Sequence, residues 1–392
     1  MKILHTVELY HPSQGGMQEV VKQISERLVK LGHEVTVATT KLSERENNII
    51  NGVTIEEFAI EGNLVRGLKG ETEKYKEFLI NSNFDIITNF AAQQWGSDLA
   101  FDILDRIKAQ KIFVPTGFSG FYLPEYIDYF KKMKDWMKKY DMNVFLSNNY
   151  RDINFARKNK IKKIKLIPNG ASEEEFFWKN NIDLREKLNI PKNHFLILHV
   201  GSHTGSKGHR EAIQIFEKAK IINATFLIIG NSFGGGCTKY CSINGKLFNI
   251  SPKRLSDKKR LIVTSLSREE TVCAYKQADL FLFPSNIECS PLVLFECMAS
   301  KTPFLTTDVG NAIEIIKRSN SGLLLPTDKD KNGYSKAKVN ESVKLLETIY
   351  TNTKKRKTMA NSGFKIWHER FTWDKIAKDY EVLYKHIAIL NN

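Results

Sequence analysis

The sequence lacks the features of a membrane-spanning or secreted protein. No apolar run approaches the ~20 residues that a membrane-spanning helix needs. The start, MKILHTVELYHP, has an apolar core too short for a signal peptide and predicts a first strand instead. Only five cysteines are present, an odd count that is typical of reduced thiols rather than of a disulfide framework. We therefore expect a cytoplasmic protein.

Signatures of dinucleotide, ATP and nucleic-acid binding are also missing. Gly15 and Gly16 follow the first predicted strand, but the G-x-G-x-x-G fingerprint is absent. The segment 205–208, with Lys207 between Ser and Gly, does not have the Gly-Lys-Ser/Thr order of a P-loop. The sequence shows no zinc finger, RRM-type aromatic motif or helix-turn-helix signature. Nucleic acid is therefore not an expected partner.

Metal-binding patterns are weak. Cys237 and Cys241 lie within a long Gly- and Lys-rich connection, 231–260, but no second pair of ligands accompanies them. Asp328 and Asp330 form a D-x-D sequence in a polar loop after the predicted strand 323–325, where carboxylates are typical of a solvated turn. The sequence therefore predicts no metal site.

Acidic residues are too few to balance the basic ones. Lys and Arg number 59 against 44 Asp and Glu, which gives a net charge of +15 and indicates an anionic partner. The segment Tyr126–Tyr140 (YIDYFKKMKDWMKKY) predicts a basic amphipathic helix that could lie on an anionic membrane. We expect Ile127, Phe130, Met133 and Met137 to face the core, and Trp136 to lie among solvated lysines. A purely solvated face, or a Lys-rich proteome, is the alternative.

Apolar strands and amphipathic helices alternate along the chain. This alternation predicts an α/β fold with open, mostly parallel sheets, and 392 residues suffice for two domains. Ligands of such sheets bind beyond the carboxyl ends of the strands. The predicted strands are 2–7, 34–39, 85–89, 112–115, 143–146 and 165–167 in the first half, and 195–200, 225–230, 261–264, 280–283, 304–306 and 323–325 in the second.

The most informative stretch is Phe283–Ala299, FPSNIECSPLVLFECMA. Ser290 is a candidate N-cap with Pro291 at the first helical position, and the helix should run to about Ser300. Its N-terminus would suit a phosphate. Glu288 precedes the helix, and Glu296 is the only charged residue within it. A buried carboxylate needs a task or a partner, so Glu296 is either a ligand-binding group or one paired with a buried Lys or Arg. The further alternative is a Glu exposed at the edge of a mostly buried helix.

Glu288 and Glu296 resemble the E-x7-E motif of the retaining glycosyltransferases of family 4, which have the GT-B fold of two Rossmann-like domains facing across a cleft. The resemblance implies that Glu288 contacts the donor sugar and that Glu296 binds the ribose of a sugar nucleotide. It also implies that the backbone at Ser290, Pro291 and Leu292 meets the diphosphate.

Other segments of the second half resemble the same family. The segment from Val200 to Gly208 is similar to V-G-R-L-x-x-x-K-G, in which Arg and Lys clamp the diphosphate. Gly201 and Lys207 match, whereas Ser202 replaces the Arg, with His203, His209 and Arg210 nearby. The resemblance places Leu266 beside the nucleotide base.

The first half matches the family less closely. Gly15 and Gly16 resemble an early Gly-Gly that approaches the donor phosphate or the acceptor, although a turn requiring positive φ would explain them equally well. Thr116 and Gly117 occupy a loop that carries a His in many members, and this chain has none there. Asn169 belongs to a segment that resembles the interdomain I-P-N-G.

The resemblance implies an acceptor-binding domain at 1–170, a nucleotide-sugar-binding domain at 171–372 and a terminal helix, 373–392, that crosses back to the first domain. We expect a retaining, metal-independent glycosyltransferase without a cofactor, whose donor is a UDP-sugar in the first place and a GDP-sugar in the second. The acceptor would be a hydroxyl of a glycan or a lipid-linked molecule, in polysaccharide or glycolipid synthesis at the inner face of the membrane.

Two alternatives remain open at this point. One is another reaction on the same fold, either sugar-nucleotide epimerisation or phosphorolysis. The other is a basic surface-binding protein with impaired catalysis, which the replacement of Arg by Ser202 suggests.

Overall fold

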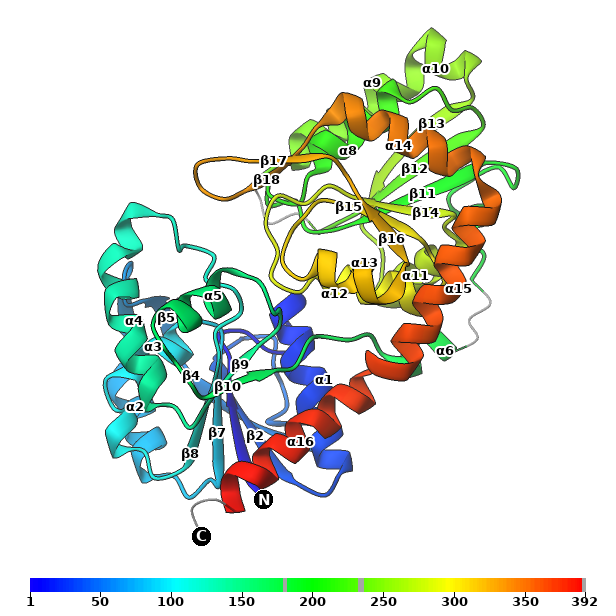
Figure 1. The fold of residues 1–392 in the computed structure, drawn as a ribbon. Coiled ribbons are helices and arrows are strands. Elements are labelled where there is room, and N and C mark those ends of the chain that lie inside the picture. The colour runs from blue at the N-terminus through cyan, green and yellow to red at the C-terminus, as the bar shows by residue number, and fades with distance from the viewer. Residues whose placement is uncertain (179–181, 232–235, 390–392) are drawn as a thin grey trace. The chain divides into compact units, whose positions relative to one another are not determined.

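Two parallel β-sheets organise the chain, each in its own unit. The computed structural model describes residues 1–178, 182–231 and 236–389 (Figure 1). One unit comprises Met1–Asn169 together with Trp373–Asn392, and the other comprises Gly170–Thr372. The first unit is therefore built from two stretches of sequence that lie at opposite ends of the chain.

The sheet of the first unit is parallel except at one edge. Its order is β10-β9-β8-β7-β1-β2-β4-β3, and only the β3–β4 hairpin is antiparallel. A separate hairpin is formed by β5 and β6. The strands are β1 (Lys2–Thr6), β2 (Glu34–Thr40), β3 (Ile49–Ile50), β4 (Val53–Phe58), β5 (Ile60–Asn63), β6 (Gly67–Gly70), β7 (Ile86–Phe90), β8 (Gln110–Val114), β9 (Met142–Phe145) and β10 (Ile164–Leu166).

Helices cover both faces of this sheet, which explains why its central strands β1 and β7 are buried almost throughout. In Figure 1, α2, α3 and α4 lie on one side of the sheet, and α1 and α16 lie on the other. The helices are α1 (Gly16–Lys30), α2 (Thr72–Asn81), α3 (Trp95–Phe101), α4 (Ile127–Lys139), α5 (Arg151–Lys158) and α16 (Trp373–Ile389).

The C-terminal helix α16 completes the first unit. Arg27 of α1 donates from Nε to Asp374 Oδ1 at 2.7 Å. The hydroxyl of Tyr384 lies 3.0 Å from His5 Nε2 and 2.8 Å from Thr88 Oγ1, on two neighbouring central strands. These buried polar contacts fix α16 against the sheet, since leaving any of them unmade inside the core would be costly.

The sheet of the second unit has the order β13-β12-β11-β14-β15-β16 and is wholly parallel. Its strands are β11 (Phe195–Val200), β12 (Ala224–Ile229), β13 (Lys259–Thr264), β14 (Leu280–Phe283), β15 (Phe304–Thr306) and β16 (Gly322–Leu324), and a hairpin is formed by β17 (Thr327–Lys329) and β18 (Ser335–Ala337). The helices are α6 (Glu173–Phe177), α7 (Leu184–Lys187), α8 (His209–Lys218), α9 (Thr238–Ile250), α10 (Pro252–Ser256), α11 (Arg268–Gln277), α12 (Leu292–Ala299), α13 (Ala312–Ser319), α14 (Val339–Thr351) and α15 (Thr353–Arg370).

Each sheet reverses its strand order at one point. In the second unit the reversal falls between β11 and β14, because β12 and β13 extend to one side while β15 and β16 extend to the other. In the first unit it falls between β1 and β7. Loops leaving adjacent strands diverge at such a switch point, so a ligand can enter there.

The connection 231–260 is helical rather than a long loop, so that prediction was wrong. Of its described residues, most belong to α9 and α10. The sequence of α9, TKYCSINGKLFNI, contains Asn and Gly, which are poor helix formers, and only Cys241, Gly245 and Phe248 are buried. The packing of these three residues against the sheet stabilises α9. Helix propensity alone does not predict this helix.

The face that α4 buries differs from the predicted one at three residues. Trp136 is only 8% exposed and stacks on Phe101, with ring centroids 4.5 Å apart, whereas we expected it among solvated lysines. Ile127, predicted to face the core, is 56% exposed. Tyr129 is buried together with Trp136. Both rings are large enough to reach the core from helix positions that we expected to face solvent.

None of the helices in the described part of the chain has the length and apolar character required to cross a bilayer.

Candidate functional site

Two loops at the switch point of the second unit bring Lys207 and Glu288 together. Lys207 follows β11, and Glu288 follows the neighbouring strand β14. The Nζ atom of Lys207 lies 2.7 Å from Oε1 of Glu288, and the two side chains are 28% and 11% exposed. A partly buried ion pair at this location can be opened by a charged ligand, because both groups remain within reach of solvent.

Backbone contacts hold these two loops against each other. The N–H of Asn286 donates to the carbonyl oxygen of Ser206 at 2.8 Å, and the Ser285 hydroxyl donates to Glu288 Oε1 at 2.8 Å. Gly208 has φ +73°, and a Cβ at that position would lie 1.9 Å from the carbonyl oxygen of Pro284. Only glycine permits this approach, so the pairing of Lys207 with Glu288 is built into the backbone.

Glu296 is buried in α12 and paired with an arginine. Its Oε1 lies 2.6 Å from Nη2 of Arg268 in α11, and the carboxylate is 8% exposed. Arg268 also binds Glu175 through two hydrogen bonds of 3.0 and 2.6 Å. Pairing with Lys or Arg is one explanation that the sequence offers for Glu296, and the structure contains that pair. Pairing with Arg268 does not prevent Glu296 from also binding a ligand. Burial raises the pKa of the neighbouring Tyr275 well above its ordinary value, and the negative charge of Glu296 is the next largest cause.

The helix α12 begins at Leu292, one residue later than predicted. Pro291 is its N-cap, with φ −68° and ψ 118°, whereas we expected Ser290 in that role. The Ser290 hydroxyl instead accepts from Nδ2 of Asn311 at 2.9 Å, which ties this turn to the loop after β15. Proline offers no side-chain oxygen to the first-turn N–H groups, so this end of α12 suits an anion.

The other predicted donor-binding residues lie at neighbouring strand ends. Gly201 follows β11, and its N–H donates to the carbonyl oxygen of Ile229 at 2.9 Å. Ser202 comes next and is half-buried, and Leu266, also half-buried, follows β13. The carboxyl ends of β11, β13 and β14 therefore carry the residues that the sequence marked as donor-binding.

The cations expected to replace the Arg at Ser202 are engaged elsewhere. The guanidinium of Arg210 stacks over the Tyr240 ring at 4.7 Å. His203 and His209 are buried, and burial lowers the pKa of both, that of His209 to about 2. Each imidazole is therefore neutral at physiological pH and contributes no charge to a diphosphate.

In the first unit the predicted loop residues surround the switch point between β1 and β7. Gly15 is the N-cap of α1 and Gly16 its first residue. Thr116 follows β8 with φ +59°, a conformation that is costly for a β-branched residue and points to a functional constraint. The N–H of Gly117 donates to Asp152 Oδ2 at 2.8 Å, and burial raises the pKa of Asp152 to about 6.

The boundary residue Asn169 is buried at the end of the first unit.

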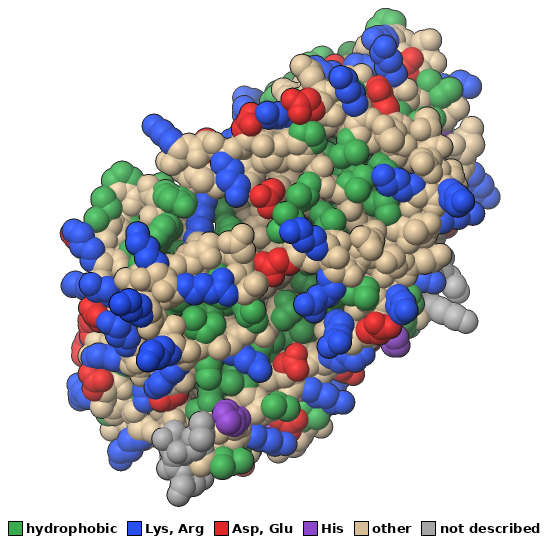
Figure 2. All heavy atoms as spheres, in the orientation of Figure 1, with side chains coloured by type: hydrophobic (Ala, Val, Ile, Leu, Met, Phe, Trp, Pro, Cys, Tyr) green, Lys and Arg blue, Asp and Glu red, His purple; other side chains and the backbone are tan. Residues whose placement is uncertain are grey.

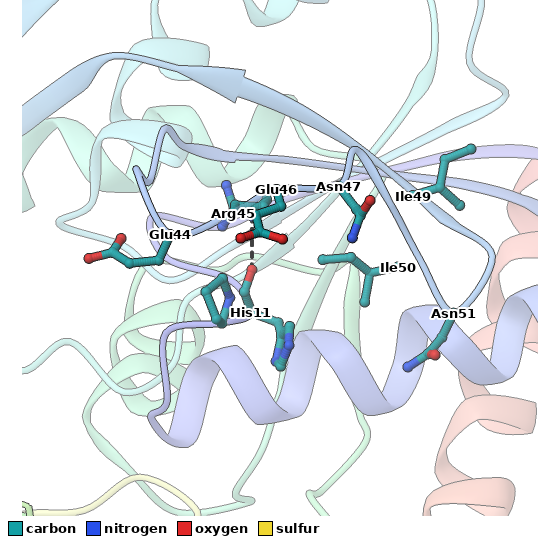
Figure 3. A pocket seen from close by; sticks show the side chains of 9 residues that line it. His11, Glu44, Arg45, Glu46, Asn47, Ile49, Ile50 and Asn51 are labelled. Carbon is teal, nitrogen blue, oxygen red and sulfur yellow. Dashed lines mark hydrogen bonds between the residues drawn. The ribbon is translucent and has the colours of Figure 1, made fainter.

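A pocket of about 350 Å³ lies in the first unit, beside the loops that follow β1 and β2 (Figure 3). His11 and Arg45 line it, together with Glu46 and Asn47. Figure 3 shows Arg45 held by a hydrogen bond from its Nε to the carbonyl oxygen of His11, at 2.8 Å. The polar lining of this pocket could bind hydroxyl groups of an organic ligand. Sequence patterns did not identify the pocket.

The carboxylates of the D-x-D sequence have other partners. Asp328 lies in β17 and pairs with Lys338 at 3.0 Å, and the carboxylate of Asp330 accepts backbone N–H groups of Asn332 and Tyr334. A different cluster, His203 with Cys237 and Cys241, brings three potential ligand atoms within 4.8 Å of one another. Sequence reasoning missed it because the His lies on another loop.

Comparison with protein families covers both units. Residues 180–365 match the model described as glycosyl transferases group 1, and residues 14–175 match the model described as glycosyltransferase family 4. The two matches together span nearly all of the chain, and each falls almost wholly within one unit.

Individual relatives are distant in sequence, and they match the whole chain or only part of it. An uncharacterised glycosyltransferase of Methanocaldococcus jannaschii is 24% identical, with 98% of each chain covered. A UDP-Gal:α-D-GlcNAc-diphosphoundecaprenol α-1,3-galactosyltransferase of Escherichia coli is 27% identical over 42% of this chain and 41% of its own.

Solved structures show the same fold. Sucrose-phosphate synthase of Thermosynechococcus elongatus superimposes with a TM-score of 0.79, at 18% identity and 98% coverage of both chains. HepE of Anabaena, in complex with UDP-glucose, superimposes with a TM-score of 0.73, at 15% identity and with 98% and 100% covered.

The first prediction separates the two roles of Glu296. Glu296→Gln should weaken binding of UDP by about 1.5–3 kcal/mol, the range for a lost hydrogen bond to a charged group. Glu175→Gln, which removes the other partner of Arg268, is the matched control and should change affinity far less. Isothermal titration calorimetry measures both. Equal losses in the two variants would show that Glu296 acts only by holding Arg268.

The second prediction concerns the missing Arg. Ser202→Arg should tighten binding of UDP severalfold while leaving uridine unchanged, because the added charge meets only the diphosphate. Ser202→Met adds bulk without charge and serves as the control. If Ser202→Arg leaves UDP affinity unchanged or lowers it, the diphosphate does not bind beside this loop.

Proposed function

Since this chain belongs to the group 1 and family 4 glycosyltransferases, we propose that it moves a sugar from a nucleotide-diphosphate sugar to an acceptor hydroxyl with retention at the anomeric carbon. The observation that carries this proposal is the Lys207–Glu288 pair at the β11–β14 switch point. A cation and a carboxylate placed beside a helix N-terminus supply the two kinds of group that a charged sugar nucleotide requires.

The donor is recognised in three parts. Lys207 and the first turn of α12 bind the diphosphate, because both present positive charge to an anion. Glu296 accepts hydrogen bonds from the ribose hydroxyls, and Leu266 packs against the base. Lys207 then exchanges part of its contact with Glu288 for the phosphate, which frees the carboxylate to bind hydroxyls of the donor sugar.

Transfer proceeds through a transition state with oxocarbenium character. The bond from the anomeric carbon to the diphosphate breaks, its electron pair stays on the leaving oxygen, and the acceptor hydroxyl forms the new bond. The leaving phosphate oxygen takes the acceptor proton, so no side-chain base is required. Lys207 stabilises the negative charge that grows on the diphosphate, which is where such preorganised charge has its largest effect.

A UDP-sugar is the first candidate donor. One relative is named for UDP-Gal, and one structure of the same fold contains UDP-glucose. A GDP-sugar remains the second candidate. The acceptor is a glycan or lipid-linked molecule, in line with the diphosphoundecaprenol named for the relative. We assign its binding to the first unit, through Gly15, Gly16, Thr116, Gly117 and Asn169.

Two other functions fit particular observations. Epimerisation of a sugar nucleotide or phosphorolysis would use the same anion site with water or phosphate in place of the acceptor. A binding protein without turnover is favoured by Ser202, since half of the cationic clamp is absent at that position. Measured turnover distinguishes all three.

The third prediction tests the reaction and its independence of divalent cations. Incubation with UDP- and GDP-sugars and a lipid-linked glycan acceptor should give a retained glycoside, identified by NMR. EDTA should leave the rate unchanged, because Lys207 and the helix dipole replace the metal. Lys207→Ala should lower kcat more than uridine affinity, since its charge matters most as the diphosphate leaves. Loss of activity in EDTA that Mg²⁺ or Mn²⁺ restores would contradict metal independence, and hydrolysis or epimerisation without transfer would favour the other reactions.

Contact with an anionic membrane is a further part of the proposal. The apolar face of α4 is buried, so any attachment through this helix is electrostatic rather than insertion of Trp136. Its five lysines are exposed, although Lys131 pairs with Asp128 at 2.8 Å and Lys138 with Asp135 at 3.4 Å. On the face shown in Figure 2, Lys and Arg side chains are scattered over both units rather than gathered in one patch.

The fourth prediction follows from this purely electrostatic attachment. The protein should co-sediment with vesicles containing anionic lipid and be released as salt rises, because screening weakens exposed charges. Changing Lys131, Lys134 and Lys138 to Glu should abolish most of this binding. The same three substitutions at the exposed positions Lys354, Lys355 and Lys357 of α15 provide a charge-matched control. Equal binding by the two triple variants would show that α4 is not the membrane-facing surface.

A further inference from the structure

Three buried side chains from two distant segments converge beside the donor loop. His203 follows β11, Cys237 is the N-cap of α9, and Cys241 lies one turn further along that helix. Their ligand atoms all lie within 4.8 Å of one another. The exposed fractions are 4%, 3% and 0%, so this cluster is shielded from solvent.

The spacing of the atoms fits tetrahedral coordination. The Sγ of Cys237 lies 3.5 Å from Nδ1 of His203. In a zinc site with bonds of ~2.3 Å to sulfur and ~2.0–2.1 Å to nitrogen, tetrahedral angles place two such atoms about 3.5 Å apart. The spacing of four residues between Cys237 and Cys241 puts both thiols on one face of α9.

The backbone fixes the approach of the two segments. The N–H of Cys237 donates to the carbonyl oxygen of His203 at 3.4 Å. Gly236 has φ +67°, and a Cβ there would lie 1.8 Å from the same oxygen. Glycine at this position lets the start of α9 reach the donor loop, so the ligand atoms are preorganised.

Two neighbouring histidines are buried beside the cluster. A carbonyl can only accept, so His209 donates from Nε2 to the Gly201 oxygen at 3.1 Å and His199 donates from Nδ1 to the Leu282 oxygen at 2.8 Å. The other ring nitrogens, Nδ1 of His209 and Nε2 of His199, are buried and have no hydrogen-bond partner among the described residues. The His209 ring stacks on that of His203, with centroids 4.4 Å apart.

A metal ion would displace the thiol protons and hold both sulfurs as thiolates, while neutral imidazole is already in its ligating form.

We propose that His203, Cys237 and Cys241 form a structural zinc site, held by one imidazole nitrogen and two sulfurs. Zinc binding releases the two thiol protons and changes no oxidation state. The ion fastens the donor loop, Gly201–Lys207, to α9, and takes no part in sugar transfer. This inference stands independently of the proposed function.

The fifth prediction is tested on the full-length protein without any sugar nucleotide. Protein purified under reducing conditions and dialysed against EDTA should retain about one zinc per chain by mass spectrometry of the metal. Replacement by Co²⁺ should give the visible absorption of a tetrahedral site and the thiolate-to-cobalt charge-transfer band. Cys237→Ser and Cys241→Ser should each weaken zinc binding at least ~100-fold, since each removes one ligand.

Cys273→Ser is the matched control, because Cys273 is a buried free cysteine of α11 outside the cluster. It should bind zinc and Co²⁺ as the unaltered protein does. The proposal is overturned if the unaltered protein, reconstituted with zinc, binds less than about a tenth of an equivalent. A Cys237–Cys241 disulfide in freshly purified protein, or equal zinc binding by the Cys237→Ser and Cys273→Ser variants, would overturn it as well.

The Co²⁺ titration of the unaltered protein decides the question even if a variant fails to fold. Amide hydrogen exchange of residues 201–207 then tests the structural role and should slow at least severalfold when zinc binds. Failure to transfer sugar leaves these results intact, whereas absence of zinc leaves the transferase assay intact. The two proposals can therefore fail separately.

Discussion

The ion pair between Lys207 and Glu288 is the interaction on which the proposed donor site depends. It joins the loops after β11 and β14, the two strands between which the sheet reverses its order. Two opposite charges are held within reach of each other and of solvent, so neither is buried unpaired. In the proposed reaction, a diphosphate would compete for the ammonium group while sugar hydroxyls would compete for the carboxylate. The ion pair is thus a structural contact whose two groups the proposed donor would take over.

Glu296 shows why a buried carboxylate need not have a single role. Arg268 binds Glu175 with two hydrogen bonds and Glu296 with a further contact, so the arginine balances two negative charges. This arrangement gives the buried carboxylate of Glu296 a cationic partner inside an apolar helix. A carboxylate held in a fixed orientation by Arg268 needs little reorganisation to accept hydrogen bonds from a ligand, which is the condition for tight and specific recognition.

Sequence patterns predicted all six strands of the second sheet, because buried parallel strands are largely apolar runs with clear ends, as in Phe195–Val200 and Leu280–Phe283. They missed β3 and β4 of the first sheet and the hairpins β5–β6 and β17–β18. They failed where tertiary contacts decide. The helix α9 forms from residues with poor intrinsic propensity, and Trp136 is buried by stacking on Phe101. The partner of Glu296 and the convergence of His203 with two cysteines join segments distant in sequence. No local spacing encodes such contacts, although the isolated charge of Glu296 did indicate that a partner or a ligand was required.

The residue that departs from the family pattern, Ser202, is adjacent to a residue of the cysteine cluster. Ser202 stands where the resemblance expects an Arg, and the next residue, His203, contacts Cys237 at the start of α9. In the proposed donor site Lys207 would bind the diphosphate without that Arg, so its position would matter more, because ordering a mobile loop on binding costs affinity. Contacts of His203 with α9, and of Gly208 with Pro284, would hold Lys207 in place before the donor binds. Such rigidity would offset the absent Arg by lowering the conformational entropy lost on binding.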